Sequence, residues 1–470
     1  MSKHQDENSK KETIPTENVE SKEKQEDDIA KTPTWTHLLK FALPTILAML
    51  VMGTFGIVDG IFVSRLIGGE ALAVVGLVFP FMAFVMAFGF MMGIGGNALV
   101  AKKLGEGREK EGRENFSLIV LVSFIVSVAL TLTGVFFPDL IMDILGVDEF
   151  LRDLAMEYLR PMLIFFPTAV LGMIYQQFLI TVGKAHYTAV MSLVGGLLSA
   201  GLNYVFIYVL DMGISGAAFA TSIGFTLPFA VGQVFFTFNR KNAVYLVRPK
   251  WDYRALGRSA VNGASEMVTM LATSITTVMM NNVLMDIDGG GFMAVGAAAV
   301  MFGGMGIFSA LFIGYASGVM PIISYNYGKN DRSNLKKTYS NSLRLIAVLS
   351  VAAVALAFLF TDLLISVYDI PEGMPTHDMA RTGLRFLAGG FIFMGFNSFA
   401  SMFFTALNNG IVSSILSFFR TLVFFAIAIL TLPVIFGLTG AWMAMPAAEI
   451  LGIVMTVVFF KLMKKKYGYA

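Results

Sequence analysis

The sequence has no cysteine among its 470 residues, and it has few histidines and few charges. Without cysteine, the chain cannot form disulfides, thiolate metal sites, iron–sulfur clusters or cysteine nucleophiles. No glycine-rich stretch is followed by the Lys-Ser/Thr of a phosphate loop. We therefore expect that the chain has no nucleotide-binding site, needs no cofactor and is not an enzyme. The net charge of only +2 argues against a nucleic-acid partner. The four histidines are too far apart in sequence to pair as metal ligands: His4, His37, His186 and His377.

Charged residues make up only 14% of the chain, against about a quarter in soluble domains, whereas 56% of the residues are hydrophobic. The mean hydropathy is +0.72. A soluble core cannot hold this excess, so most of the chain must lie in a membrane. Apolar stretches of about 20 to 30 residues, each long enough to cross a bilayer as a helix, follow one another. They cover 37–65, 71–101, 115–137, 154–181, 187–210, 214–238, 256–285, 292–325, 338–361, 379–406, 411–435 and 438–462.

The sequence therefore predicts an all-α polytopic membrane protein with twelve transmembrane helices in two six-helix lobes. Residues 1–34 are rich in Lys, Glu, Asp, Asn and Ser and predict a disordered cytoplasmic tail. We expect an N-lobe over 35–238, a cytoplasmic linker over 239–255, a C-lobe over 256–463 and a short C-terminal tail over 464–470.

The distribution of Lys and Arg predicts the orientation of the chain in the membrane. From Phe41 onward there are 27 such residues, and 21 of them fall in one alternating set of loops together with the C-terminus. Basic loops remain in the cytoplasm, so we expect both termini there, in the plasma membrane. The opposite loops are acidic and hold five basic residues: Arg65, Arg152, Arg160, Arg381 and Arg385.

An internal repeat relates the two halves, with matching residues about 223 positions apart. Parallel six-helix repeats are typical of alternating-access transporters, whose sites lie between or within the halves. The matched pairs are Gly95 with Gly318, Lys102-Lys103-Leu104-Gly105 with Tyr325-Asn326-Tyr327-Gly328, Asp139-Leu140 with Asp362-Leu363, Leu159-Arg160 with Leu384-Arg385, and Gly216-Ala217-Ala218 with Gly440-Ala441-Trp442.

Ionisable residues inside membrane spans are costly and mark functional sites. Four stand out here: Asp59, Glu266, Arg420 and Glu449. Burial disfavours the charged form of a carboxylate, so the acids can exchange a proton or bind a cation. The alternative for Arg420 is a purely structural ion pair with Glu449 or Glu266. The adjacent Gln176 and Gln177 in the fourth span are further candidates for lining a binding site.

The chain resembles the multidrug and toxic compound extrusion (MATE) transporters over nearly all of residues 37–462. Each motif that carries the resemblance is weak alone, but together they follow the order and spacing of the family. They are Pro44, Val58-Asp59-Gly60-Ile61-Phe62-Val63-Ser64, Gly68-Gly69-Glu70-Ala71-Leu72-Ala73, Asn203-Tyr204, Gly216-Ala217-Ala218-Phe219-Ala220-Thr221, and Gly318-Val319-Met320-Pro321 with Tyr325-Asn326-Tyr327-Gly328.

The resemblance implies a V-shaped pair of six-helix bundles with a cavity in the N-lobe. It implies that Asp59 is the proton- or sodium-linked switch and the place for a Na⁺ ion, with Tyr158 and Thr221 beside it. On the fifth helix the family's acid is missing, and two registers remain open. One register puts Ser199 and Asn203 at the family's two polar positions, and the other puts Asn203 first and Ile207 at the position of the acid.

In the C-lobe, Glu266 matches the seventh-helix Glu of one branch of the family. The tenth-helix Asp of some relatives has no match, because residues 379–406 contain no acid. A cation site in the C-lobe is therefore incomplete unless Glu449 contributes.

These residues predict secondary active efflux of organic cations or amphipathic drugs in exchange for H⁺ or Na⁺, by a monomer embedded in the lipid bilayer. The alternative within the same superfamily is a flippase for lipid-linked saccharides. A flippase favours a cationic cavity and usually fourteen spans. Here the buried charge is net acidic and there are twelve apolar stretches, which favour the antiporter. A channel or a membrane sensor is a third alternative.

Overall fold

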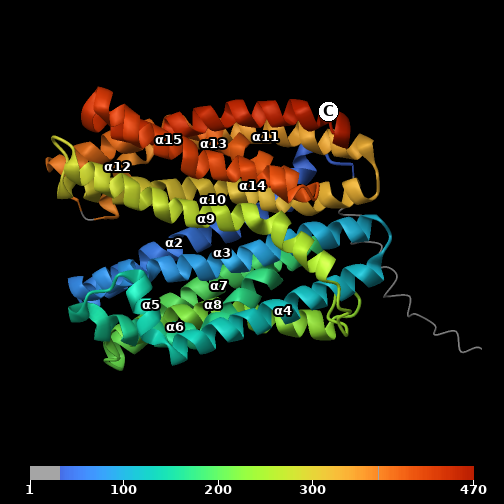
Figure 1. The fold of residues 1–470 in the computed structure, drawn as a ribbon, viewed down its shortest axis with the longest axis horizontal. Coiled ribbons are helices and arrows are strands. Elements are labelled where there is room, and N and C mark those ends of the chain that lie inside the picture. Colours follow the sequence, from blue (N-terminus) through green and yellow to red (C-terminus); the bar gives the residue numbers. More distant parts are fainter. Residues whose placement is uncertain (1–31, 369) are drawn as a thin grey trace, which may run out of the picture.

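The computed structural model describes residues 32–368 and 370–470, and all the regular structure within those residues is helical. The tail expected over 1–34 therefore lies almost wholly outside the described residues. Within them, eleven helical runs are long and apolar enough to cross a membrane. The runs lie side by side in one elongated bundle, with the first half of the chain on one side and the second half on the other (Figure 1). The predicted all-α membrane fold is confirmed.

The first half of the chain consists of long helices that extend beyond the predicted apolar stretches. Pro44, Pro80 and Pro228 lie inside these helices without ending them. The elements are α2 (Trp35–Leu66), α3 (Gly69–Gly105), α4 (Glu109–Phe136), α5 (Pro138–Leu145), α6 (Glu149–Thr181), α7 (Ala185–Asn203), the π-helix η1 (Tyr204–Val209) and α8 (Gly213–Phe238).

The second half begins at Asp252, which caps α9 by accepting hydrogen bonds from the backbone N–H groups of Arg254 and Ala255 at 3.0 and 3.1 Å. A carboxylate at this position satisfies backbone donors that the first turn leaves free. The elements are α9 (Tyr253–Asp286), α10 (Phe292–Gly328), α11 (Arg332–Leu359), α12 (Thr361–Ser366), α13 (Pro375–Ala406), α14 (Gly410–Phe418), the π-helix η2 (Phe419–Val423) and α15 (Phe424–Tyr467).

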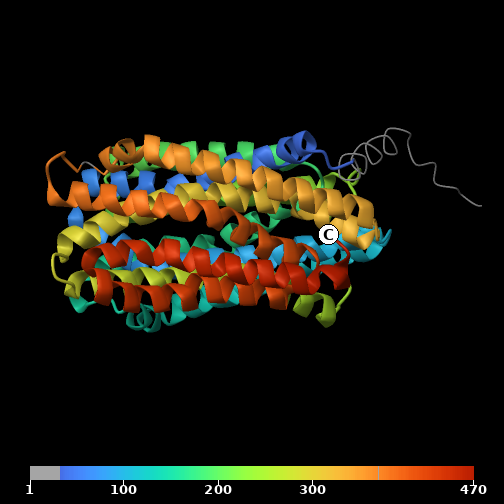
Figure 2. The ribbon, with the colours of Figure 1, turned by 90° about the horizontal axis from the view of Figure 1, so that it is seen from above.

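The last helical run folds back on itself and supplies two spans. It covers 58 residues, Gly410–Tyr467, and Gly437 within it has non-helical dihedrals (φ 61°, ψ −144°). Arg420 and Glu449 form an ion pair of 3.2 Å across this bend. In a straight helix they would lie about 44 Å apart. The described chain thus has twelve spans, and both of its ends lie at the same end of the bundle (Figures 1 and 2).

The short helices α5 and α12 lie where the sequence predicted only acidic loops. Asp139 of α5 and its repeat counterpart Asp362 of α12 each accept a hydrogen bond from an arginine of the next long helix, Arg152 and Arg381. Both bonds are 3.0 Å long. Each half therefore contains a short helix that is hydrogen-bonded to the long helix that follows it.

The linker after α8 is non-helical but is held against α4. Arg113 of α4 donates from Nε to the carbonyl of Ala243 at 2.8 Å, and the backbone N–H of Val247 donates to the hydroxyl of Ser117 at 2.9 Å. The connection between the two halves is thus packed along the surface of the first half.

The halves meet through glycines that let backbones approach closely, which is common where membrane helices cross. A β-carbon on Gly314 of α10 would lie 2.7 Å from the Cα of Ile46 on α2, and one on Gly318 would lie 2.8 Å from the Cα of Ala42. The crossing of α3 and α9 is equally close and is related to the first by the repeat. This reciprocity is the mark of a twofold arrangement.

The described contacts between the halves concentrate at the end of the bundle that holds the termini. There the ammonium of Lys102 lies 5.1 Å from the centre of the Tyr327 ring, which belongs to the other half. Buried apolar residues from both halves join in one cluster that reaches Tyr467 and Tyr469 near the C-terminus. We call these contacts the seal between the halves.

Candidate functional site

Asp59 lies two turns before the end of α2, and its carboxylate is held by side chains of α7 and α8. Asn203 donates from Nδ2 to Oδ1 of Asp59 at 2.7 Å, and Thr221 donates from Oγ1 to Oδ2 at 2.6 Å. The hydroxyl of Ser199 also hydrogen-bonds the carboxylate. The structure thus brings together Asp59, Asn203, Thr221 and Ser199, which the sequence analysis had assigned to one group.

The local fold explains why these polar groups converge. Ser199 and Asn203 are four residues apart on α7 and therefore lie on the same helix face. A β-carbon on Gly195 would lie 2.9 Å from the carbonyl oxygen of Gly224, and one on Gly224 would lie equally close to the carbonyl of Gly195. This close crossing brings α7 against α8. Directly after Asn203 the chain widens into η1 (Tyr204–Val209), and such π-helical turns are frequent at functional sites.

The two registers that the sequence left open place different side chains of the fifth helix beside Asp59. Ser199 and Asn203 both bond Asp59, as the first register requires. Ile207, which the second register puts at the position of the acid, is buried in an apolar cluster with Val63 and Tyr158. These contacts favour the first register, which stays a prediction.

Tyr158 lies near this group but is less closely involved than the sequence suggested. It is buried in α6 and interacts electrostatically with Asp59. Among the described residues, no hydrogen bond joins the two side chains. We assign it to the surroundings of the carboxylate.

A cavity of about 200 Å³ opens beside Asp59, between α2 and α7. Apart from the carboxylate and two hydroxyls, its walls are apolar. A concave apolar site with few polar groups is the usual form of a small-molecule site. The cavity is lined by Val51, Thr54, Phe55, Val58, Asp59, Leu193, Gly196, Leu197, Ser199 and Ala200.

A second charged cluster lies in the other half, where α9, η2 and α15 meet. Arg420 donates from Nη1 to Oε1 of Glu449 at 3.2 Å, with both side chains largely buried. Glu266 of α9 interacts electrostatically with the same guanidinium. Two carboxyl groups thus share one arginine. A cavity of about 60 Å³ adjoins it, lined in part by Met305 and Phe425.

Asn397 completes this cluster, and the sequence analysis did not select it. Its Nδ2 donates to Oε2 of Glu449 at 2.7 Å and to the backbone carbonyl of Glu449 at 3.0 Å, and its Oδ1 accepts from the Thr456 hydroxyl at 2.9 Å. A signal was present in the sequence, because Asn397 interrupts an apolar span. An amide in such a span is a candidate alongside the ionisable residues.

The Glu449 carboxylate accepts hydrogen bonds from both Arg420 and Asn397, and losing a hydrogen bond to a charged group costs about 1.5–3 kcal/mol. We therefore expect Glu449→Gln to lower the melting temperature of the purified protein by several degrees. The exposed acid Glu372, which lies in a turn, provides the matched control, and Glu372→Gln should leave the melting temperature unchanged. An unaltered melting temperature in Glu449→Gln would show that the pair contributes nothing.

Gln176 and Gln177 lie away from both clusters, in the contacts that α6 makes with α7 and α3. The side-chain oxygen of Gln176 accepts a hydrogen bond from Ser192 at 3.3 Å. The backbone carbonyl of Gln177 accepts one from Asn97 at 3.1 Å. These contacts give both residues a packing role in the structure.

Among the described residues, no group of three or more His, Asp or Glu side chains could hold a metal ion. The oxygen atoms around Asp59 are of the hard type that alkali and alkaline-earth cations prefer, but they include only one carboxylate. The group suits a proton or a single monovalent cation.

Comparison with known proteins gives one consistent result. The MatE family model matches residues 44–205 and 266–430. The chain is 22% identical, over 89% of its own length and 92% of the relative's, to the multidrug export protein MepA of Staphylococcus aureus. Among solved structures, it resembles a MATE protein in complex with MaL6 (TM-score 0.88, 22% identity, 95% of this chain and 100% of the other). It also resembles an outward-facing multidrug resistance MATE transporter (TM-score 0.85, 22% identity, 92% and 96%).

Proposed function

The chain belongs to the MATE family of transporters, and from this premise we propose that it exports organic cations or amphipathic drugs in exchange for H⁺ or Na⁺, with Asp59 as the coupling residue. The observation that carries the proposal is the Asp59 carboxylate, held by donors from two other helices beside an apolar cavity. The relatives include multidrug export proteins of Staphylococcus, which supports the substrate class.

Charge neutralisation at Asp59 would change the contacts that hold three helices together. In the charged state the carboxylate only accepts hydrogen bonds, and it accepts them from Asn203 and Thr221. Adding a proton creates a donor and removes the charge that strengthens both bonds. The Oδ1 atom of Asn203 is buried and has no hydrogen-bond partner among the described residues, so it offers an acceptor for that proton after the amide turns over. A sodium ion could use the same oxygens.

Coupling follows because ion and cationic substrate compete for one negative charge. If a proton or Na⁺ neutralises Asp59, a cation in the adjoining cavity loses its electrostatic attraction, and by reciprocity the bound cation disfavours the ion. An inward ion gradient therefore favours release of the drug on the outside. A membrane potential of about 100 mV supplies about 2.3 kcal/mol per charge moved, enough for a roughly 50-fold gradient.

The seal between the halves supports alternating access and an orientation. The contacts between the halves lie at the end with the termini, and Lys102 and Lys103 at the end of α3 and Lys464–Lys466 at the end of α15 lie at the same end. If basic residues face the cytoplasm, both termini are cytoplasmic and this conformation is closed to the cytoplasm. The C-lobe cluster has two acids, Glu266 and Glu449, and one arginine, which favours a cation over an anionic lipid-linked saccharide.

Transport by inside-out vesicles tests this proposal. Vesicles from cells that express the chain should accumulate ethidium when an ion gradient is imposed. If H⁺ is the coupling ion, a proton uncoupler abolishes accumulation, and if Na⁺ is, dissipating a sodium gradient does so. The reference is vesicles from cells with the empty vector. Accumulation that survives collapse of both gradients, or no accumulation above the reference for any of several cationic dyes, would exclude an ion-coupled drug antiporter.

A further inference from the structure

One face of α6 carries exposed charges within a membrane span. Asp153, Glu157 and Arg160 are exposed and follow one another at helical spacing, and the next residue on that face, Ile164, is apolar and 61% exposed. The opposite face of α6 is buried within the first half of the chain, as at Leu159. The exposed stripe therefore changes from charged to apolar along the helix, as expected for a surface that passes from the lipid headgroups into the hydrocarbon.

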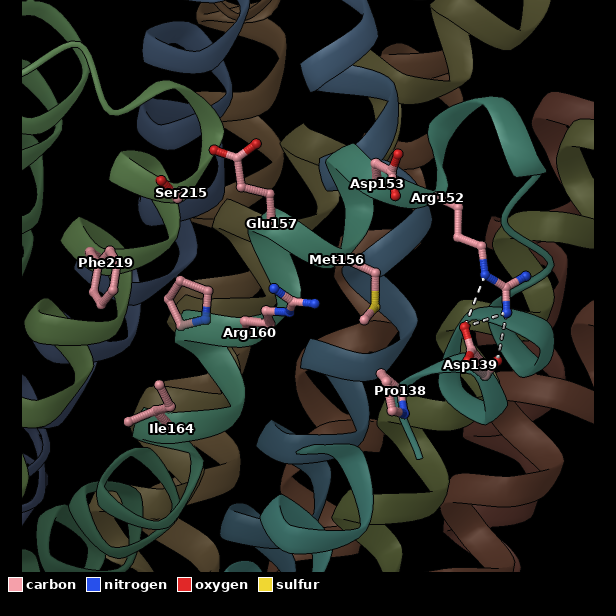
Figure 3. A pocket seen from close by; sticks show the side chains of 11 residues that line it. Pro138, Asp139, Arg152, Asp153, Met156, Glu157, Arg160, Ile164, Ser215 and Phe219 are labelled. Atoms are coloured by element: carbon pink, nitrogen blue, oxygen red, sulfur yellow. Dashed lines mark hydrogen bonds and ion pairs between the residues drawn. The ribbon is translucent and has the colours of Figure 1, made fainter. Parts of the chain in front are cut away.

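This stripe forms the floor of a cavity of about 590 Å³ between α5, α6 and α8 (Figure 3). Figure 3 shows the Arg160 side chain near the middle of the cavity, with Glu157 and Ser215 toward one end and Ile164 toward the other. Every residue that lines it belongs to the first half of the chain. The cavity thus lies on the outside of one half and is separate from the Asp59 cavity.

The helix α5 fixes the depth of this cavity in the membrane. It is short and strongly amphipathic, and it exposes Leu140 and Ile144, the latter by 74%, while its Asp139 and Asp143 bind Arg152. A short helix with an exposed apolar face beside charged residues is typical of the membrane interface. The cavity beside α5 therefore lies at the level of the lipid headgroups, in the leaflet opposite the termini.

The charges in the cavity are only partly paired. Arg152 is occupied by Asp139 and Asp143 at 3.0 and 3.1 Å. In the part of the chain that the structure describes, no ion pair involves Arg160, Glu157 or Asp153. At the level of the headgroups, water or a lipid phosphate supplies the counter-ion of such an arginine.

We propose that this cavity binds a zwitterionic phospholipid whose headgroup carries a phosphate and a primary ammonium, as in phosphatidylethanolamine. The guanidinium of Arg160 suits the phosphate, because arginine offers several donors in a planar fork. Glu157 and Asp153 suit the ammonium, whose three N–H groups can each donate to a carboxylate oxygen. The acyl chains lie along Ile164 and Phe219. One free cation beside two free carboxylates matches this headgroup better than it matches an anionic lipid.

Native mass spectrometry of the purified full chain tests the proposal. The protein is incubated with phosphatidylethanolamine and phosphatidylglycerol of identical acyl chains, and retained lipid is counted after detergent removal. We expect retention to favour phosphatidylethanolamine about tenfold, and Arg160→Gln to remove that preference. The matched control is Arg385→Gln, since Arg385 is the exposed repeat counterpart of Arg160 on α13 and does not line this cavity.

A second variant and a soluble competitor complete the test. Glu157→Gln should weaken retention of phosphatidylethanolamine while leaving phosphatidylglycerol unchanged, and it serves if Arg160→Gln fails to fold. Glycerophosphoethanolamine, the same headgroup without acyl chains, should not compete at equal concentration. Equal retention of the two lipids by the unaltered chain, full retention by both variants, or competition by the soluble headgroup would each overturn the proposal.

Discussion

Asp59→Asn is expected to lower ion-driven dye efflux by roughly 5- to 150-fold, the range that a coupling free energy of 1–3 kcal/mol produces. An asparagine keeps the size of the side chain and can still accept hydrogen bonds from Thr221 and Ser199. It cannot change charge, so neither H⁺ nor Na⁺ can alter its contacts with α7 and α8. The measurement is the initial rate of ethidium uptake into inside-out vesicles at matched protein levels.

A matched control separates loss of coupling from loss of fold. Asp148 is exposed, precedes α6 and makes no capping hydrogen bond with its side chain, so Asp148→Asn should transport at the normal rate. The second readout is binding of tetraphenylphosphonium at pH 6 and pH 8. The unaltered chain should bind it more weakly at the lower pH if H⁺ is the coupling ion, and Asp59→Asn should bind it equally at both. If Asp59→Asn keeps full ion-coupled efflux, Asp59 is not the coupling residue.

The sequence led to the group around Asp59 because helical periodicity and family motifs both constrain it. Ser199 and Asn203 had to share a face once α7 was a helix, and the match with the family indicated which carboxylate they face. The same reasoning could not decide between the registers. That choice depended on how far α7 is rotated against α8, which the Gly195–Gly224 crossing sets.

Other features could not be predicted from the sequence because the spans are apolar on all sides. In a helix with a polar stripe, the sequence shows which face is buried. In a helix surrounded by lipid and protein, all faces are apolar and the sequence does not show which face packs against protein. The sequence therefore offers Gln176 and Gln177 as lining residues, and the structure places both inside the contacts of α6, where Gln176 accepts a hydrogen bond from Ser192. Arg160 counts with the acidic loops by its charge although the predicted stretch 154–181 contains it, and the structure places it inside α6. The helix α5 has only eight residues, too few to give the signal of a membrane span.

The seal between the halves was the least predictable feature. The chain has 46 glycines, and their positions alone do not show which of them lie at crossings between the halves. In the structure, a β-carbon on Gly95 of α3 would lie 2.5 Å from the backbone nitrogen of Gly263 on α9, and one on Gly263 would overlap the backbone carbonyl of Met91. Backbone atoms cannot rotate away as a side chain can, so these crossings close only if both positions lack a β-carbon.

Gly263→Ala is accordingly expected to abolish efflux by preventing closure at the end with the termini. Overpacking typically costs about 1–3 kcal/mol. Each 1.4 kcal/mol shifts a two-state equilibrium tenfold. The ratio of the sealed to the open conformation should therefore fall by roughly 5- to 150-fold. The absence of native cysteine makes the shift directly measurable. A single cysteine introduced as Ala98→Cys is fully buried in the sealed bundle and should react with a maleimide only when the halves separate there.

Gly257, six residues earlier on α9, provides the matched control, because a β-carbon at that position meets no atom within 4 Å. Gly257→Ala should improve helix propensity by about 1 kcal/mol and leave both efflux and labelling at the level of the unaltered chain. When Gly263→Ala is added, the cysteine of Ala98→Cys should react with the maleimide at least several-fold faster than it does without that change. If its labelling and efflux equal those of Gly257→Ala, the close crossing of α3 and α9 does not limit the transport cycle. If labelling rises but efflux persists, the seal at this end is not required for coupling, and the two-state alternating-access scheme fails for this chain.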